Sequence, residues 1–391
     1  MFTKKAWDVI VVGAGVVGAA CARAAARSGL AVAVVDRGPV AGGTTGAGEG
    51  NLLVSDKPPG PELDLALLSL GLWRSLAEEL PDAVEFEAKG GLVVAAGPES
   101  LAALGRTAEG QRAAGVRAES VGPDELRALE PHLTPHLAGG VRYPQDAQIQ
   151  PALAAAHLLR AARDDGAVFH PGRTVTAVLT GPRGEVRGVR TDAGDLLAPA
   201  VVNATGVHGG ELAALAGVEL PVLPRRGFVL VTEPLPRLIR HKVYAAEYVA
   251  DVSSASAELQ TSPVVEGTAA GPVLIGASRE RVGYDRTLSV PVVSRLAAAA
   301  AALFPVLART RVLRAYHGFR PYLPDHLPAI GPDGRVPGLF HACGHEGAGI
   351  GLAPATAALI TAALLGERPP VDPHPFRPDR FGPEPVTVRS A

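Results

Sequence analysis

Three closely spaced glycines near the N-terminus, followed by an acid, have the pattern of a dinucleotide-binding turn. The glycines are Gly13, Gly15 and Gly18, and the acid is Asp36. Glycines at this spacing permit a tight turn, let a pyrophosphate approach the backbone and allow a helix to pack closely on a strand. An acid in the place of Asp36 accepts hydrogen bonds from ribose hydroxyls and repels a 2′-phosphate. We therefore predict a dinucleotide site here.

Two strands and one helix must hold this turn in place. Residues 8–12 and 31–35 are short apolar runs with β-branched side chains, which is typical of central parallel strands. Residues 19–28 are rich in alanine and predict a helix that stops at Gly29. The free N–H groups and the positive dipole end at the start of this helix favour a phosphate. Three glycines alone often mark only a tight turn, and the strand–helix–strand context argues against that alternative.

A second glycine-rich segment, 42–50, leads into the apolar residues 52–54. It contains Thr44 and Thr45, whose hydroxyl groups can donate hydrogen bonds to phosphate. So many glycines indicate backbone that is packed against another group or has a positive φ. A flexible loop is the alternative. We interpret the segment as lining a bound cofactor, which the first motif alone leaves open between FAD and NAD.

Composition and charge exclude several classes of protein. The chain has 391 residues, a net charge of −2 and 47% hydrophobic residues, so we expect a large core and no affinity for nucleic acid through bulk charge. Cys21 and Cys343 form no disulfide or zinc pattern, which favours a cytoplasmic location. Strand alternation explains the spacing of His341 and His345, so no metal is expected. The longest apolar stretch, 352–365, is too short for a transmembrane segment.

The remaining pattern predicts an α/β cofactor domain with a β-rich domain inserted into it. Helices are expected at 63–80, 123–129, 151–163, 292–304 and 352–365. Strands are expected at 90–96, 174–179, 196–204, 227–232, 242–249, 273–276 and 339–342, with a proline-rich turn around Arg320. We expect a Rossmann-like domain built from residues 1–86, 145–222 and 315–391. The inserted antiparallel-sheet substrate domain would then comprise 87–144 and 223–314.

Taken in this order, the motifs make the chain resemble the flavin-dependent D-amino-acid oxidase superfamily, which includes glycine oxidase and the β-type subunits of sarcosine oxidase. The matching segments are 13–36, 44–45, 146–151, 201–206, 318–321, 328–331, 344–347 and 352–354. The segment 43–56 and the one around Glu346 are most similar to the β subunits of amino-acid and opine dehydrogenases. Some of those subunits work in complexes, so the resemblance implies a possible partner subunit or electron carrier.

The resemblance implies that the cofactor is FAD in an extended form. The residues matching the AMP and pyrophosphate positions are Gly13, Gly15, Val16, Val17, Gly18, Asp36 and Arg37. Those matching the phosphate and flavin side are Gly43, Thr44, Thr45, Gly48 and Gly50, with Val175 at the adenine and Ala204 and Gly206 at a second turn. The helix start beneath the pyrimidine end of the flavin corresponds to Gly347, Gly349, Ile350 and Gly351. No cysteine clearly matches the positions used for covalent attachment, so we expect non-covalent FAD.

The resemblance also implies a substrate site centred on Arg320. An arginine holds a carboxylate in a fixed plane through two parallel hydrogen bonds, and pairing with a structural acid such as Asp325 is the alternative. Asn51, Tyr244 and Tyr248 are further candidates for contact with the substrate. The two tyrosines are spaced to share one face of a strand, although ordinary sheet packing explains them nearly as well. Acids and a histidine in the flavin-side segments could bind a substrate amine or cap backbone: Glu49, Glu346 and His345.

The expected activity is the oxidation of an amino acid or secondary amine by hydride transfer from Cα–H to flavin N5, giving an imine and then a keto acid. Glycine, sarcosine, proline or hydroxyproline, a D-amino acid and an opine all remain open as substrates. We favour a dehydrogenase that passes electrons to a carrier or partner subunit. A self-contained oxidase that produces hydrogen peroxide is one alternative, and a non-catalytic flavin-binding subunit is another. An NAD-dependent enzyme would leave the segment 42–50 unexplained.

Overall fold

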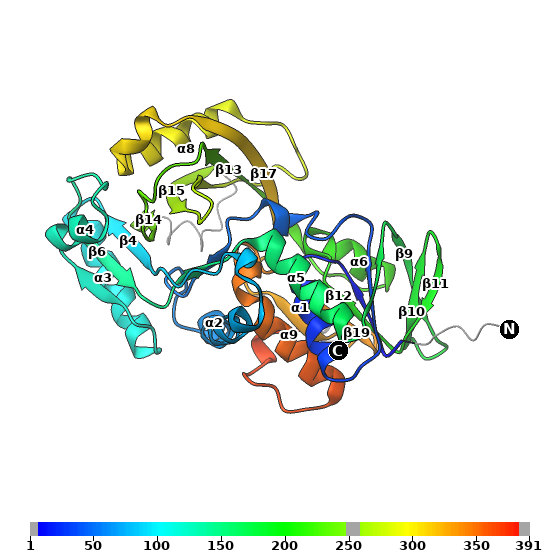
Figure 1. Cartoon of the computed structure of the whole chain (residues 1–391). Helices are drawn as coiled ribbons and strands as arrows, with labels where there is room; N and C mark the ends of the chain where they lie inside the picture. The colour runs from blue at the N-terminus through cyan, green and yellow to red at the C-terminus, as the bar shows by residue number, and fades with distance from the viewer. Residues whose placement is uncertain (1–6, 248–258, 383–391) are drawn as a thin grey trace, which may run out of the picture.

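The computed structural model describes residues 7–247 and 259–382, and two large sheets organise them (Figure 1). The six-stranded sheet has the order β18-β19-β12-β1-β2-β8. Its strands are β1 (Val9–Val12), β2 (Val32–Asp36), β8 (Val168–Pro171), β12 (Ala200–Asn203), β18 (Ala329–Pro332) and β19 (Leu339–Cys343). All of its neighbours pair in parallel except β18 and β19. This arrangement confirms the α/β core expected from the sequence.

Alternation along β1 and β2 gives the six-stranded sheet two apolar faces. Val9, Val11, Val32 and Val34 pack toward the core of helices, which includes α1 (Val16–Arg27), α2 (Pro61–Glu79), α5 (Pro151–Asp164) and α9 (Gly349–Leu365). Ile10, Val12, Ala33 and Val35 pack instead against a three-stranded antiparallel sheet of β9 (Val175–Thr180), β10 (Val186–Thr191) and β11 (Gly194–Leu197). Burial on both faces accounts for the continuous apolar runs in the sequence.

The eight-stranded sheet has the order β17-β13-β16-β15-β14-β4-β6-β5. Its strands are β4 (Gly91–Ala95), β5 (Glu119–Val121), β6 (Gly139–Tyr143), β13 (Leu223–Thr232), β14 (Lys242–Ala245), β15 (Gln260–Gly267), β16 (Val273–Arg279) and β17 (Val312–Tyr322). One face is apolar and is covered by α8 (Val290–Leu303), whose Leu296 and Ala300 lie in the same cluster as Phe228 and Ile275. Residues of the other face, among them Val93, Val141 and Val264, belong to the same apolar cluster as α1, α2 and α9.

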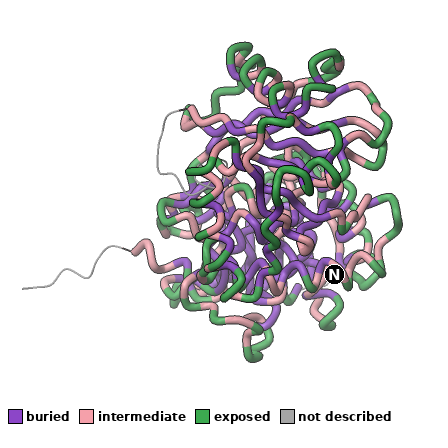
Figure 2. The backbone as a smooth tube through the Cα atoms, turned by 90° about the vertical axis from the view of Figure 1, so that its left-hand side faces the viewer, coloured by how far each residue is buried: buried purple, intermediate pink, exposed green. Residues whose placement is uncertain are grey.

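Short elements complete the two lobes, one built on the six-stranded sheet and the other on the eight-stranded sheet. They are β3 (Asn51–Leu52), β7 (Ala147–Gln148), α3 (Pro98–Ala113), α4 (Pro123–Leu129), α6 (Gly209–Leu215) and the 3-10 turns η1 (Thr44–Ala47), η2 (Asp82–Val84), η3 (Gly206–His208), η4 (Pro305–Arg309), η5 (His374–Phe376) and η6 (Pro378–Phe381). Buried backbone runs through the middle of both lobes and exposed backbone lies mainly in the outer loops (Figure 2). Within the described ranges, no helix combines the length and apolar character needed to cross a membrane.

Three local predictions were wrong. The expected turn around Arg320 is part of β17, which pairs with β13 along its length. Glycine and proline in this run suggest a turn, but β17 is an edge strand, where the missing N–H of Pro321 is tolerated. The strand expected at 242–249 ends at Ala245, and its last two residues lie outside the described ranges. The strand expected at 196–204 is two strands, β11 and β12, separated by a break around Pro199. The expected domain boundaries stay predictions; residue 315 lies within β17.

Candidate active site

A cavity of about 530 Å³ lies between the two large sheets. One end is formed where β1, β2 and β12 stop, at Gly13, Asp36 and Ala204, so it lies at the carboxyl ends of parallel strands. Ligands of open α/β sheets bind in this position. The other end reaches the eight-stranded sheet at Gly227 and Arg320. The cavity therefore joins the predicted nucleotide end to the predicted substrate end.

The glycine turn is shaped by close backbone contacts. Gly13 has φ 114°, and a Cβ there would lie closer than 3.0 Å to the carbonyl of Ala204. A Cβ at Gly18 would likewise overlap the carbonyl of Gly13, so Gly18 lets α1 pack on the turn without itself lining the cavity. The Asp36 carboxylate accepts hydrogen bonds from the N–H groups of Ala14 and Gly38, both at 2.7 Å. Asp36 therefore also fixes the loops around the turn.

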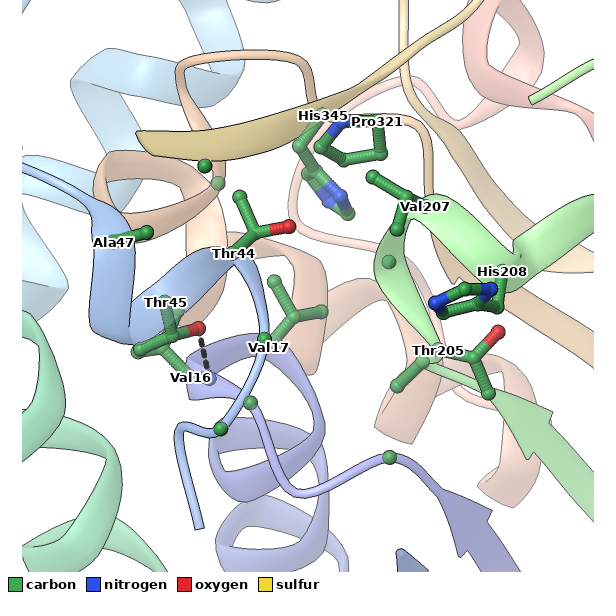
Figure 3. Close-up of a pocket in the computed structure, with 18 of the residues that line it drawn as sticks. Val16, Val17, Thr44, Thr45, Ala47, Thr205, Val207, His208, Pro321 and His345 are labelled. Atoms are coloured by element: carbon green, nitrogen blue, oxygen red, sulfur yellow. Dashed lines mark hydrogen bonds between the residues drawn. The ribbon is translucent and has the colours of Figure 1, made fainter. Parts of the chain in front are cut away.

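The two threonines of η1 make different contacts (Figure 3). Thr45 Oγ1 accepts a hydrogen bond of 3.0 Å from the N–H of Val16 at the start of α1, so its own hydroxyl hydrogen remains able to donate. Thr44 Oγ1 donates to the carbonyl of Phe319 at 2.7 Å, which uses its hydrogen and ties η1 to β17. Facing them across the cavity are the side chains of Thr205, Val207 and His208 (Figure 3).

Arg320 lies at the end of the cavity nearest the eight-stranded sheet. Its Nη1 donates to the carbonyl of Ser278 at 2.9 Å, and a Cβ on Gly227 would overlap the same nitrogen. Asp325, the acid named as an alternative partner, accepts hydrogen bonds from Arg380, with 2.7 Å to Arg380 Nε. Gly227 therefore provides the space that the guanidinium occupies.

The N-terminus of α9 forms the adjacent wall. Ala348 caps this helix without a side-chain hydrogen bond, and Gly347, Gly349 and Ile350 line the cavity. Glu346, just before them, has φ 49° and accepts from Arg225 Nη1 at 2.5 Å. Burial opposes ionisation of Glu346, but the hydrogen bond from His326 and the charge of Arg225 lower its pKa below the usual value. Glu346 is thus an ionised acid that is already paired.

Most of the predicted residues line the cavity. These are Gly13, Gly15, Val16, Val17, Asp36, Arg37, Gly43, Thr44, Thr45, Gly48, Gly50, Asn51, Val175, Ala204, Gly206, Arg320, Gly347, Gly349 and Ile350. Gly18 and Gly351 are packed behind it, and Tyr248 lies outside the described residues. Their roles toward a ligand stay predictions.

The placement expected for Tyr244 needs correction. Its side chain is fully buried and its hydroxyl contacts Ser55 Oγ, which in turn contacts Asp146. Burial, reinforced by the Asp146 charge, raises the pKa of Tyr244 well above its usual value. Tyr244 therefore joins the sheet to the loop after β3 and does not line the cavity. Strand alternation predicts that Tyr244 and Tyr248 share one face of a strand. It does not predict whether that face borders the cavity or the buried core.

The sequence pattern did not identify Gly227 as part of the site. It begins the expected strand 227–232 but lies inside the observed β13, and a glycine inside a strand often marks the close approach of another group. A glycine in a strand therefore indicates a close approach but does not identify the approaching group. Val229, two residues later, lines the same cavity, as strand alternation requires.

The sequence matches the family model described as FAD dependent oxidoreductase over residues 8–363. The chain belongs to this family. The hydrogen cyanide synthase subunit HcnC of Pseudomonas aeruginosa is 31% identical, over 99% of each chain. The glycine oxidase of Geobacillus kaustophilus is 30% identical over 95% of this chain and 96% of its own.

Solved structures agree with this assignment. The crystal structure of the Geobacillus kaustophilus glycine oxidase superposes on this FAD-dependent oxidoreductase with a TM-score of 0.86 and 28% identity, covering 95% and 98% of the two chains. The L-proline dehydrogenase of P. horikoshii superposes with a TM-score of 0.87, covering 97% and 98%. Its 24% identity shows a shared fold alone.

The cavity of this FAD-dependent oxidoreductase fits its cofactor. The N-termini of two helices, α1 at Val16 and α9 at Ile350, border one elongated cavity, and each offers N–H groups to negative charge. Gly15, at the start of α1, has no Cβ that would block a close approach of pyrophosphate. The nearest atom to a Cβ built on Gly15 would be Thr45 Oγ1, at 3.1 Å. We propose that α1 and Asp36 hold the nucleotide end and that α9 holds the flavin end. Among the described residues, no group of acids, histidines and cysteines is placed to hold a metal.

We expect FAD to be bound without a covalent bond and to be released when the protein is denatured. Both cysteines of the chain are buried outside the cavity lining, and burial raises the pKa of each thiol to about 12. Such thiols are poor nucleophiles, so we expect non-covalent FAD. Protein precipitated with acid should be colourless and leave all flavin in the supernatant. Yellow colour in the washed precipitate would contradict the expectation.

His345 gives the second expected result, an acid-dependent loss of stability. Burial lowers its pKa to about 3 from 6.5, and its Nε2 lies 2.9 Å from Thr356 Oγ1. Between pH 3 and pH 6.5, His345 is therefore protonated more in the unfolded chain than in the folded protein. The free energy of unfolding consequently falls as the pH is lowered below 6.5. Lowering the pH from 7.5 to 5 should remove about 2 kcal/mol through this residue.

A His345→Gln variant should lose about 2 kcal/mol less unfolding free energy than the wild type over that interval. The buried Asp146, with a pKa raised to about 7 chiefly by burial, has the opposite dependence, but it is common to both proteins. Urea unfolding of the holoprotein at pH 5 and pH 7.5 measures the difference. Equal losses in the two proteins would show that His345 is not buried in its neutral form.

Proposed function

We propose that this FAD-dependent oxidoreductase oxidises an amino acid or a secondary amine at Cα and passes the electrons to a carrier or partner subunit. The observation that carries the proposal is the placement of Arg320 at the end of the cavity next to Gly347 and the start of α9. Arg320 Cδ and Nε would lie 3.6 Å from a Cβ on Gly347, so the guanidinium is beside the wall that we assign to the flavin.

This position suits a carboxylate clamp. A guanidinium binds a carboxylate through two hydrogen bonds and so fixes the orientation of the attached Cα. Bound FAD supplies the acceptor for a hydride. The chain supplies orientation: Arg320 sets the substrate plane, and the Ser278 carbonyl holds one edge of the guanidinium. Such a reaction depends on positioning and electrostatics more than on a dedicated general base.

The relatives support the amino-acid class without deciding the acceptor. Glycine oxidase is an oxidase by name, whereas HcnC is named as a subunit, which favours a partner. We propose the dehydrogenase and keep an oxidase as the second candidate. Peroxide formation is measured with one substrate in air, and dye reduction is measured with the same substrate without oxygen. The ratio of the two rates distinguishes an oxidase from a dehydrogenase. A peroxide yield near one per turnover would support the oxidase.

The class of substrate is tested by anaerobic bleaching of the holoprotein with a panel. The panel contains glycine, sarcosine, L- and D-proline, hydroxyproline, D-alanine and an opine, with lactate as the hydroxy-acid control. Bleaching by at least one amino acid or secondary amine, and none by lactate, supports the proposal. Bleaching by none of the amines would reject it and would favour a non-catalytic flavin subunit.

A further inference from the structure

Three neighbouring strands carry glycines on the face that borders the cavity. Gly318 of β17 pairs directly with Gly227 of β13, and Gly276 lies on the adjacent strand β16. A Cβ on any of the three would lie closer than 3.0 Å to another group. The groups in these spaces are the Ala47 side chain at Gly318, Arg320 Nη1 at Gly227 and Glu49 Oε1 at Gly276. The sheet thus makes room for one basic and one acidic side chain.

Glu49 is an acid whose burial is not explained by the fold. It lines the cavity, only 8% of its surface is exposed, and its Oε1 is buried without a hydrogen-bond partner in the described ranges. The other glutamate of the flavin-side segments, Glu346, is paired with Arg225 and His326. Lys242, on the same sheet, forms an ion pair of 3.0 Å with Glu266. A buried carboxylate with an unmatched oxygen is costly, and a bound cation would offset that cost.

The two charged side chains contact the same short segment of β16. Glu49 Oε1 lies at Gly276, and Arg320 Nη1 donates to the carbonyl of Ser278, two residues further along β16. A substrate carboxylate at Arg320 and a substrate amino group at Glu49 would each form a charge-assisted hydrogen bond.

We propose that Glu49 binds the amino group of the substrate while Arg320 binds its carboxylate. The site then selects zwitterionic α-amino acids, with a primary or secondary amine, against hydroxy acids that offer no positive charge to Glu49. This inference rests on the proposed function, since it assigns a residue to the recognition of that substrate class. It makes Glu49 a specificity-determining residue in direct contact with the substrate.

Two ligands that cannot be oxidised separate the roles of the charges. 2-Aminoisobutyrate carries both charges but no hydrogen on Cα, and pivalate is its near-isostere with a methyl group in place of the amine. Each is titrated into the holoprotein, and binding is followed by the change in the visible flavin spectrum. The wild type should bind 2-aminoisobutyrate at least about tenfold more tightly than pivalate, which corresponds to one charge-assisted hydrogen bond.

Glu49→Gln should remove this preference. The variant keeps the size of the side chain but loses its charge, so 2-aminoisobutyrate should bind at least about tenfold more weakly while pivalate binds as before. The exposed Glu99→Gln, at the start of α3, removes one negative charge elsewhere and should change neither affinity. Equal losses for both ligands in Glu49→Gln, or no loss for either, would overturn the proposal. So would a wild type that does not distinguish the ligands.

A second pair of variants tests the same geometry without changing charge. Gly276→Ala places a methyl group against the Glu49 carboxylate and should weaken 2-aminoisobutyrate alone. Gly227→Ala places it against the Arg320 guanidinium and should weaken both ligands. If Gly276→Ala weakened the binding of pivalate as much as that of 2-aminoisobutyrate, Glu49 would have only a structural role. This test remains decisive if Glu49→Gln does not fold.

The two proposals fail in different ways. If amino acids bleach the wild-type flavin but Glu49→Gln leaves 2-aminoisobutyrate binding unchanged, the oxidation of amino acids stands and the role of Glu49 is wrong. If no amino acid or secondary amine bleaches the flavin, the proposed function itself fails.

Discussion

Alanine in place of Arg320 is expected to lower kcat/KM for the best amino-acid substrate by about two to three orders of magnitude. Truncating one partner of a desolvated, hydrogen-bonded charge pair costs about 3–4 kcal/mol, and each 1.4 kcal/mol is a factor of ten. The guanidinium lies in the cavity, held by the Ser278 carbonyl in the space that Gly227 leaves. Steady-state kinetics with saturating electron acceptor measure the effect.

Two further variants show whether geometry or charge matters at this position. Arg320→Lys keeps the positive charge but loses the planar fork, so its kcat/KM should lie between those of the wild type and Arg320→Ala. The exposed Arg311, just before β17, is the matched control, and Arg311→Ala should leave kcat/KM unchanged. Unaltered kinetics in Arg320→Ala would remove the carboxylate clamp from the account.

Gly13→Ala should yield protein with little or no bound FAD. The backbone of Gly13 has φ 114°, and a Cβ there would overlap the carbonyl of Ala204, which is backbone and cannot move aside cheaply. Overpacking of this kind costs about 1–3 kcal/mol, and the positive φ adds to it. The turn would have to shift, and with it the N-terminus of α1 that we assign to the pyrophosphate.

Gly29→Ala is the matched control for this result. Gly29 also has a positive φ, 85°, but a Cβ there would meet no atom within 4 Å. The control therefore has a comparable backbone cost without the overlap. The flavin-to-protein ratio after purification and the Tm of each variant are measured. Gly13→Ala should lose most of its flavin, whereas Gly29→Ala should lower Tm and retain it. Equal flavin content in the two would contradict the proposed nucleotide site.

The nucleotide end could be predicted because its signals are local. The turn, the strands at its ends and Asp36 lie within one short stretch, and periodicity and glycine spacing identify such a unit. The predicted helix at 19–28 begins earlier, at Val16, because the glycine turn itself supplies its first residues. Local patterns thus give the elements reliably and their ends less so.

The substrate end could be predicted only in part. Arg320 was found through its motif, but its strand was read as a turn because the pairing with β13 involves residues far away along the chain. Tyr244 is in a strand as expected, yet its hydroxyl meets Ser55 rather than the cavity. The two roles open for Glu49 could not be separated in the sequence, since Gly276 and Ser278 are distant from it. Long-range packing decides these positions.

Anaerobic reduction of the bound flavin by substrate tests the central claim most directly. Purified holoprotein is mixed without oxygen with each member of the amine panel and, separately, with lactate, and the visible flavin absorbance is followed. We expect bleaching by an amino acid or secondary amine, none by lactate, and a large loss of the bleaching rate in Arg320→Ala. Bleaching by lactate but by none of the amines would contradict it.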